Sequence, residues 1–281
     1  MSLGALAGCT SALANGGVPG DAEATTTSAV VIVERSVDET AGTRAETSAR
    51  FVRVPASASL IDALRTIGAA VDLPAPSSCA SVAALANTGA AVARVAAAEV
   101  ELADVGAVSL EASGHETRLL PRQIPDVTDV VSGVVYARAG EPALFPASTR
   151  YVVHVAGGAD VDPFDVTATA PADPSDVKVA GDDGTTGVTV ATGSPIELSW
   201  AADGSDDALY VDVQPAGFRC ALADGAGAAD AQLHASIPAA LLDEAGSLVV
   251  HRVHREALAA RGIETGEVRF DFSRSLPYVR H

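Results

Sequence analysis

Residues 49–55 read ARFVRVP, and their alternation indicates the class of fold. Phe51 and Arg53 fall on one side of an extended chain, while Val52 and Val54 fall on the other. A period of two over β-branched and aromatic residues is typical of a half-buried β-strand. We therefore predict a strand here.

The same pattern continues towards Ala170 in short segments bounded by Gly, Pro, Asp and Ser. They read VELADVGAVSLEA (100–112), SGVVYAR (132–138), RYVVHVA (150–156) and FDVTATA (164–170). One segment, SASLIDALRTIGAAV (57–71), has a helical period, because Leu60, Ile61, Leu64, Ile67 and Val71 share one helical face. Ser59 and Asp62 have capping-box spacing, so we predict a helix near residues 59–70. For residues 82–98 the alanines favour a helix, while Gly89 favours a break.

A second series of strands follows residues 170–187, which are rich in Pro, Gly and Asp and predict a domain boundary. About seven short strands are expected in the remaining residues, with a helical turn at 238–246. That spacing is typical of an immunoglobulin-like sandwich. Its expected core aromatics are Trp200, Tyr210, Phe218, Phe270 and Phe272.

These observations predict a mainly all-β protein in three parts. Residues 1–45 are expected to be a residual signal sequence and a flexible tether. Residues 46–171 are expected to form a β-sandwich with the helix inserted. Residues 172–281 are expected to form a separate Ig-like β-sandwich.

The composition excludes some partners. The formal net charge is -18, and Lys178 is the only lysine, so a nucleic acid would be repelled by the field of the protein. No run of residues is long and apolar enough for a membrane-spanning helix. The three cysteines have no zinc-site spacing, and no motif indicates a cofactor.

The sequence Leu6-Ala7-Gly8-Cys9 resembles the lipobox of bacterial lipoproteins, in which a signal peptide is cut before an acylated cysteine. A small, polar, Gly-rich stretch follows it, as a tether would. Residues 1–8 lack a positive charge, so the chain is expected to begin inside its signal peptide. The resemblance implies lipidation of Cys9, and Thr10 implies the outer membrane. The alternative is an unanchored tail on a secreted protein. The C-terminal half also resembles Ig-like repeats of envelope lipoproteins of unknown role.

Lipidation of Cys9 would leave Cys79 and Cys220, which could pair in an oxidising compartment or remain as two buried thiols.

His251 and His254 could suggest a metal site. On a strand, however, an offset of three places them on opposite faces, so we expect no shared metal.

Several aspartates lie in Gly-rich stretches that could supply oxygen ligands to calcium. Without EF-hand spacing, solvated turns are the simpler interpretation. These weak candidates are Asp160, Asp162 and Asp165, Asp182 and Asp183, and Asp203, Asp206 and Asp207.

No catalytic motif is present: G-x-S-x-G, H-E-x-x-H and the P-loop are all missing. We therefore expect a non-catalytic cell-envelope lipoprotein, a binding or structural module for an envelope protein or a glycan. The alternatives are a glycan-binding adhesion module and a secreted hydrolase with a site in a cleft between domains. The oligomeric state is left open.

Overall fold

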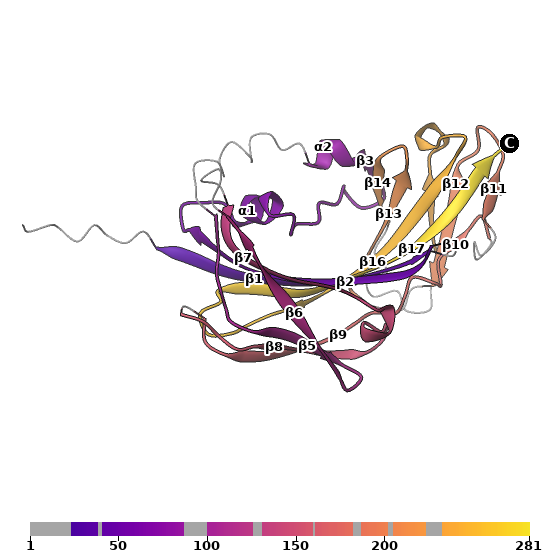
Figure 1. Cartoon of the computed structure of the whole chain (residues 1–281). Helices are drawn as coiled ribbons and strands as arrows, with labels where there is room; N and C mark the ends of the chain where they lie inside the picture. The colour runs from indigo at the N-terminus through magenta and orange to yellow at the C-terminus, as the bar shows by residue number, and fades with distance from the viewer. Residues whose placement is uncertain are drawn as a thin grey trace, which may run out of the picture.

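The computed structural model describes residues 24–38, 41–86, 100–125, 131–159, 161–181, 187–201, 205–222 and 232–281. The protein is mainly β, as the sequence predicts (Figure 1). Within the described residues, no helix is long and apolar enough to cross a membrane.

The first half of the chain contains the elements β1 (Thr25–Asp38), β2 (Gly42–Pro55), α1 (Leu60–Thr66), β3 (Ser78–Ser81), α2 (Val82–Ala86), β4 (Val100–Leu102), β5 (Val108–Ala112), β6 (His115–Ile124), β7 (Val131–Gly140), η1 (Pro142–Leu144), β8 (Arg150–Val155) and β9 (Phe164–Thr169). The second half contains β10 (Lys178–Val179), β11 (Val188–Val190), β12 (Ile196–Ala201), β13 (Ala208–Gln214), β14 (Phe218–Ala221), β15 (Gln232–Ile237), η2 (Ala239–Leu241), β16 (Ala245–Ala257) and β17 (Thr265–Arg280).

One large sheet runs through both halves of the chain. Its fourteen strands include the order β3-β14-β13-β16-β17-β1-β2-β4-β7-β6-β5-β8-β9, and β11 pairs with β17. β10, β12 and β15 form a second sheet. The prediction of two separate sandwiches, 46–171 and 172–281, is therefore wrong. The reason is that β1 from the start of the chain pairs in parallel with β17 from its end.

The interpretation of residues 1–45 as leader and tether is also wrong for β1 and for the start of β2. Residues 27–33 of β1 are buried without alternation. Ala29, Val31 and Val33 belong to the main core, while Val30 and Ile32 pack under the α1 region on the other face. A strand covered on both faces gives a continuous apolar run, and such a run lacks the period-two signal.

In the described residues, two main hydrophobic cores lie along the large sheet, and smaller clusters lie near α1. One is built on β1, β2, β5, β8 and the first half of β17, and the other lies between the sheet and β12. Trp200 belongs to the second core, as expected. Phe270 and Phe272 belong to the first core, because β17 is long enough to serve both.

The helix predicted near 59–70 is shorter than expected. Ser59 caps it by accepting a hydrogen bond from the Asp62 backbone N–H, and it ends at Thr66 before Gly68, whose φ is +66°. The predicted apolar face is partly wrong, because Ile61 is 50% exposed while Asp62 is buried. Asp62 is retained inside by its ion pair with Arg65.

Figure 1 shows α1, α2 and β3 on one side of the long strands and β5, β8 and β9 on the other. Cys79 of β3 and Cys220 of β14 form a disulfide. The two strands are antiparallel neighbours, so the bridge attaches the segment after α1 to the far end of the sheet. We call residues 67–81 the covering segment.

Candidate functional site

The central strands carry apolar residues on one face. On the other face Val30 and Ile32 pack in the α1 region, and the remaining part carries mainly charged and polar residues, which we call the polar face. Odd-numbered residues of β1 and β2 and even-numbered residues of β17 supply the main core. Their neighbours in sequence point the opposite way, because side chains alternate along a strand. The polar face carries Glu34 and Ser36 from β1; Arg44, Glu46, Ser48 and Arg50 from β2; Glu267, Arg269, Asp271 and Ser273 from β17; and His251, Tyr210, Asp212 and Arg219 from β16, β13 and β14.

Three carboxylates form a row across this face. Glu34 lies directly opposite Glu46 on β2 and directly opposite Asp271 on β17. Like charges in cross-strand positions are destabilising. The row is therefore a concentration of negative charge that stability alone does not favour.

Asp271 is the best-connected member of the row. Nδ1 of His251 lies 2.7 Å from its Oδ1, and the Tyr210 hydroxyl donates to its Oδ2 at 3.0 Å. The rings of Tyr210 and His251 stack with centroids 4.3 Å apart. Asp212 lies 3.9 Å from the other nitrogen of His251, so this imidazole has a carboxylate on each side.

Arg219 connects the polar face to the covering segment. Its guanidinium donates to both oxygens of Asp212 and lies over the Tyr210 ring. It also donates to the backbone carbonyl of Asp72 at 3.2 Å, and the Asp72 side chain accepts from Arg65 of α1. The covering segment is thus held by hydrogen bonds as well as by the disulfide.

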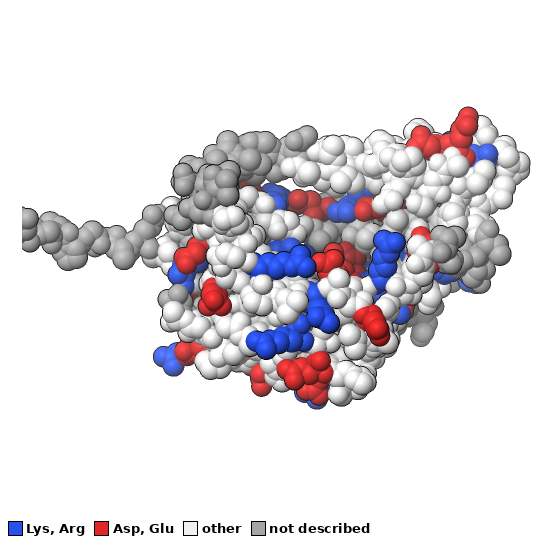
Figure 2. Space-filling model, in the orientation of Figure 1, with Lys and Arg blue, Asp and Glu red and all other residues white. Residues whose placement is uncertain are grey.

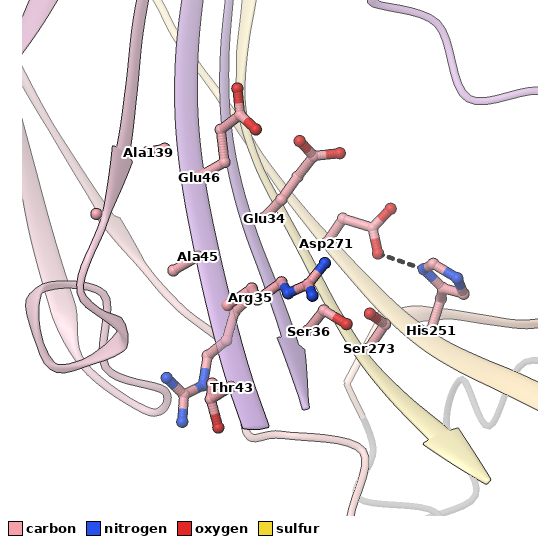
Figure 3. A pocket seen from close by; sticks show the side chains of 12 residues that line it. Glu34, Arg35, Ser36, Thr43, Ala45, Glu46, Ala139, His251, Asp271 and Ser273 are labelled. Atoms are coloured by element: carbon pink, nitrogen blue, oxygen red, sulfur yellow. Dashed lines mark hydrogen bonds and ion pairs between the residues drawn. The ribbon is translucent and has the colours of Figure 1, made fainter. Parts of the chain in front are cut away.

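Among the cavities that the described residues form on the polar face, three lie over its carboxylates and arginines and share lining residues. One of about 490 Å³ lies over Glu34, Glu46, His251, Asp271 and Ser273 (Figure 3). The next, of about 270 Å³, shares Glu34, His251 and Asp271 with it and adds Arg50, Arg219 and Arg269. A third, also of about 490 Å³, shares Glu46 with the first and Ser48 and Arg50 with the second. Figure 2 shows a hollow in this region with acidic and basic atoms in its walls. We call these cavities together the groove.

The environment shifts the pKa values of Glu34 and Asp271 in opposite directions. Glu34 is reached by water in the groove. Even so, burial within the groove raises its pKa, and the charges of Asp271 and Glu46 add to the effect. Burial also opposes ionisation of Asp271, but the hydrogen bonds from His251 and Tyr210 and the charge of Arg269 outweigh it and lower the pKa of Asp271. Glu34 therefore takes up a proton more readily than Asp271 does.

Burial lowers the pKa of Arg50 and of Arg269, although both guanidiniums keep acidic neighbours. The two side chains come from strands on either side of β1. Two desolvated cations therefore lie next to the row of carboxylates. A site of this kind can hold a ligand that carries charges of both signs.

His251 and His254 lie on opposite faces of β16, as the sequence predicts, and each has its own aspartate. Nδ1 of His254 lies 2.6 Å from Asp207, and its side chain is on the Phe270 side of the sheet. Neither histidine hydrogen-bonds to a serine or cysteine within the described part of the chain. His251 belongs to the groove, and His254 does not.

The calcium candidates do not come together in the described residues. Asp162 pairs with Arg261, Asp165 lies beside His154, and Asp207 pairs with His254. Across the described ranges, no group of three His, Cys, Asp or Glu side chains could hold a metal ion. Cys9, Asp160, Asp182, Asp183 and Asp203 lie outside the described residues.

The sequence patterns did not identify Glu34, Glu46, Arg50, Arg269 and Asp271 as site residues. The acidic candidates came from Gly-rich stretches, whereas these three acids lie within strands. A signal was present in β2, where Arg44, Glu46, Ser48 and Arg50 alternate with Ala45, Thr47 and Ala49. Alternation of this kind also describes a solvated face. Only the pairing of β1 with β2 and with β17 shows that the charged residues of these strands share one face of the sheet.

No protein-family model matches the chain, and no curated protein matches it. Among solved structures, the chain is similar to the Mu homology domain of Fcho1 from Danio rerio with a bound Eps15 peptide. The identity is 12%, the match covers 90% of this chain and 96% of that one, and the TM-score is 0.26. At that TM-score neither fold nor function is transferred.

Proposed function

We propose that this protein is a binding module of the bacterial cell envelope, carried on a lipid anchor at Cys9, and that its ligand occupies the groove. The observation that carries the proposal is the gathering of Glu34, Asp271, Arg50 and Arg269 on one face of the sheet, with cavities above them. The lipobox resemblance supports the anchor and the outer-membrane location.

The energetics support a ligand. Removing charged groups from water costs several kcal/mol per ion unless close partners compensate for it. The polar face brings like charges into adjacent cross-strand positions, although an apolar face would pack under the covering segment at lower cost. Such an arrangement is typical of sites that recognise a charged molecule.

The proposal is tested with the full chain immobilised and exposed to solubilised envelope polymers and envelope proteins. We expect the wild-type protein to retain one component, and we expect the double variant Glu34→Gln, Asp271→Asn to lose it. The matched control is Glu141→Gln with Asp165→Asn, which removes two carboxylates outside the groove. Equal retention by all three proteins would exclude the groove as the binding site.

A second candidate function is hydrolysis, and one observation favours it. Glu34 and Asp271 are cross-strand neighbours whose pKa values are shifted apart. Pairs of acids with opposite shifts can divide the work of a general acid and an ionised carboxylate. A hydrolase would release soluble fragments from an envelope polymer and would lose that activity in Glu34→Gln. A binding module would retain the polymer intact.

A further inference from the structure

We propose that the groove binds a zwitterion, specifically an ω-amino acid or a ligand ending in one. Its carboxylate would lie on Arg50 and Arg269, and its ammonium group would lie among Glu34, Glu46 and Asp271. This inference rests on the proposed function, which places a ligand on the polar face, and it names the chemistry of that ligand.

Arg269 provides the first observation. It is 4% exposed and lines the 270 Å³ cavity, yet its Nε has no hydrogen-bond partner among the described residues. In the same part of the chain, its one hydrogen bond runs from Nη1 to Glu267 at 3.1 Å. By contrast, Arg252 is equally buried, and its Nη2 donates to both oxygens of Asp176. A guanidinium that is buried and only partly bonded lacks an acceptor.

Arg50 provides the second observation. It lines the same cavity, and it donates a single hydrogen bond, to the neutral hydroxyl of Ser48. In the described part of the chain no salt bridge joins Arg50 to a carboxylate within 4.0 Å, whereas Arg35, Arg219 and Arg252 each have one. Arginine forks match the planar geometry of a carboxylate. Arg50 and Arg269 therefore form a set of hydrogen-bond donors that is open to the carboxylate of a ligand.

At the acidic end of the groove, two carboxylates lack hydrogen-bond donors among the described side chains. Glu34 and Glu46 lie opposite each other, and no described side chain donates a hydrogen bond to either carboxylate. Only Asp271 of the row has donors, His251 and Tyr210. An ammonium group placed here would neutralise the repulsion within the row and would supply three donors.

The separation between the carboxylates and the arginines favours a ligand whose two charges lie apart. Arg269 lies two residues from Asp271 on β17, and the Arg50 guanidinium reaches back to Ser48, which lies two residues from Glu46 on β2. The positive groups are therefore displaced from the row of carboxylates by about 6.6 Å along the strands. The two cavities over these groups share Glu34, His251 and Asp271. An anion alone would meet the carboxylates, and a cation alone would meet the arginines. A chain of about three to five methylene groups between ammonium and carboxylate, as in 4-aminobutanoate and 6-aminohexanoate, satisfies both ends.

The test is calorimetric titration of the full chain with glycine, 4-aminobutanoate, 6-aminohexanoate, hexanoate and hexylammonium at constant ionic strength. We expect the two longer amino acids to bind at least about tenfold more tightly than the others, because each charged end supplies a charge-assisted contact. Arg50→Gln and Glu34→Gln should each weaken binding by about tenfold. Arg118→Gln and Glu141→Gln, which lie outside the groove, should leave it unchanged. A thermal melt of each variant establishes that it is folded.

Each of the following outcomes of the titrations would overturn the inference. Binding of hexanoate as tight as that of 6-aminohexanoate, unaffected by Glu34→Gln, would indicate a simple anion site. Binding of hexylammonium alone would indicate a cation site. If no probe binds but an envelope component is retained through Glu34 and Asp271, the zwitterion inference fails while the proposed function stands. If neither occurs, both fail.

Discussion

Nδ1 of His251 lies 2.7 Å from Oδ1 of Asp271, and the ring of Tyr210 stacks on the imidazole while its hydroxyl donates to the same carboxylate. The three residues come from β16, β17 and β13, so the contact joins three strands of the polar face. It fixes Asp271 as an acceptor at the centre of the groove.

Asp271→Asn should therefore reduce the free energy of unfolding by about 3 kcal/mol, because the change removes a nearly buried carboxylate that accepts hydrogen bonds from both His251 and Tyr210. Asp165→Asn is the matched control, since the Asp165 side chain is 68% exposed in its pair with His154. It should cost about 0–1 kcal/mol. Urea unfolding at pH 7 measures both, and equal losses would show that the Asp271 contact has no special role.

The pH dependence of stability should differ between the two shifted acids. The folded-state pKa of Glu34 is raised, so its carboxylate destabilises the native state at pH 7, and this cost disappears as pH falls below about 4. Glu34→Gln should then stabilise the protein at pH 7 by less than about 1 kcal/mol, because Glu34 is solvent-exposed in the groove. At pH 4 the variant and wild type should be alike.

The Asp271 carboxylate should have the opposite effect on stability, since it stabilises the native state at pH 7. Its folded-state pKa is lowered, so its contribution is present above the ordinary value near 4 and is lost as pH falls through the lowered value. The stability gap between wild type and Asp271→Asn should therefore shrink below about pH 4. A gap that widens on acidification would mean that the direction of the Asp271 shift is wrong.

The disulfide between Cys79 and Cys220 should hold the covering segment over the groove. Its loss in Cys79→Ala should cost about 2–4 kcal/mol, since the bridge spans 141 residues and restricts the unfolded chain. Residues 67–81 should also become the first site of limited proteolysis. Cleavage at the same rate with and without the bridge would show that Arg219 and Arg65 hold the segment by themselves.

The anchor can be tested in the native cell. Labelled palmitate should be incorporated into the wild-type precursor, because the acyl chains would be attached to Cys9, and it should be lost in Cys9→Ala. Cys220→Ala, which removes a different cysteine, is the matched control and should keep the label. Label that persists in Cys9→Ala would contradict lipidation at this position.

The sequence predicted individual strands well and their association poorly. Residues 49–55 and 150–155 form strands because one chain segment contains the whole alternating pattern. β1 was missed because both of its faces are covered, one by the main core and the other by the α1 region. Ser59 was identified correctly because a cap depends on residues three apart.

The groove could not be predicted because it depends on pairing between the two ends of the chain. Glu34 and Asp271 face each other through the parallel pairing of β1 with β17, and local patterns carry no information on that register. Taken alone, each acid resembles a residue of a solvated strand. Only the assembled sheet places them beside Arg50 and Arg269.

Photocrosslinking in the native cell tests whether a ligand occupies the groove. Ser36 lines the groove, and its replacement by p-benzoylphenylalanine should yield a discrete crosslinked product on irradiation. The same replacement at Arg118, an exposed residue of β6 outside the groove, should yield none. A product from position 118 with none from position 36 would show that no ligand occupies the groove.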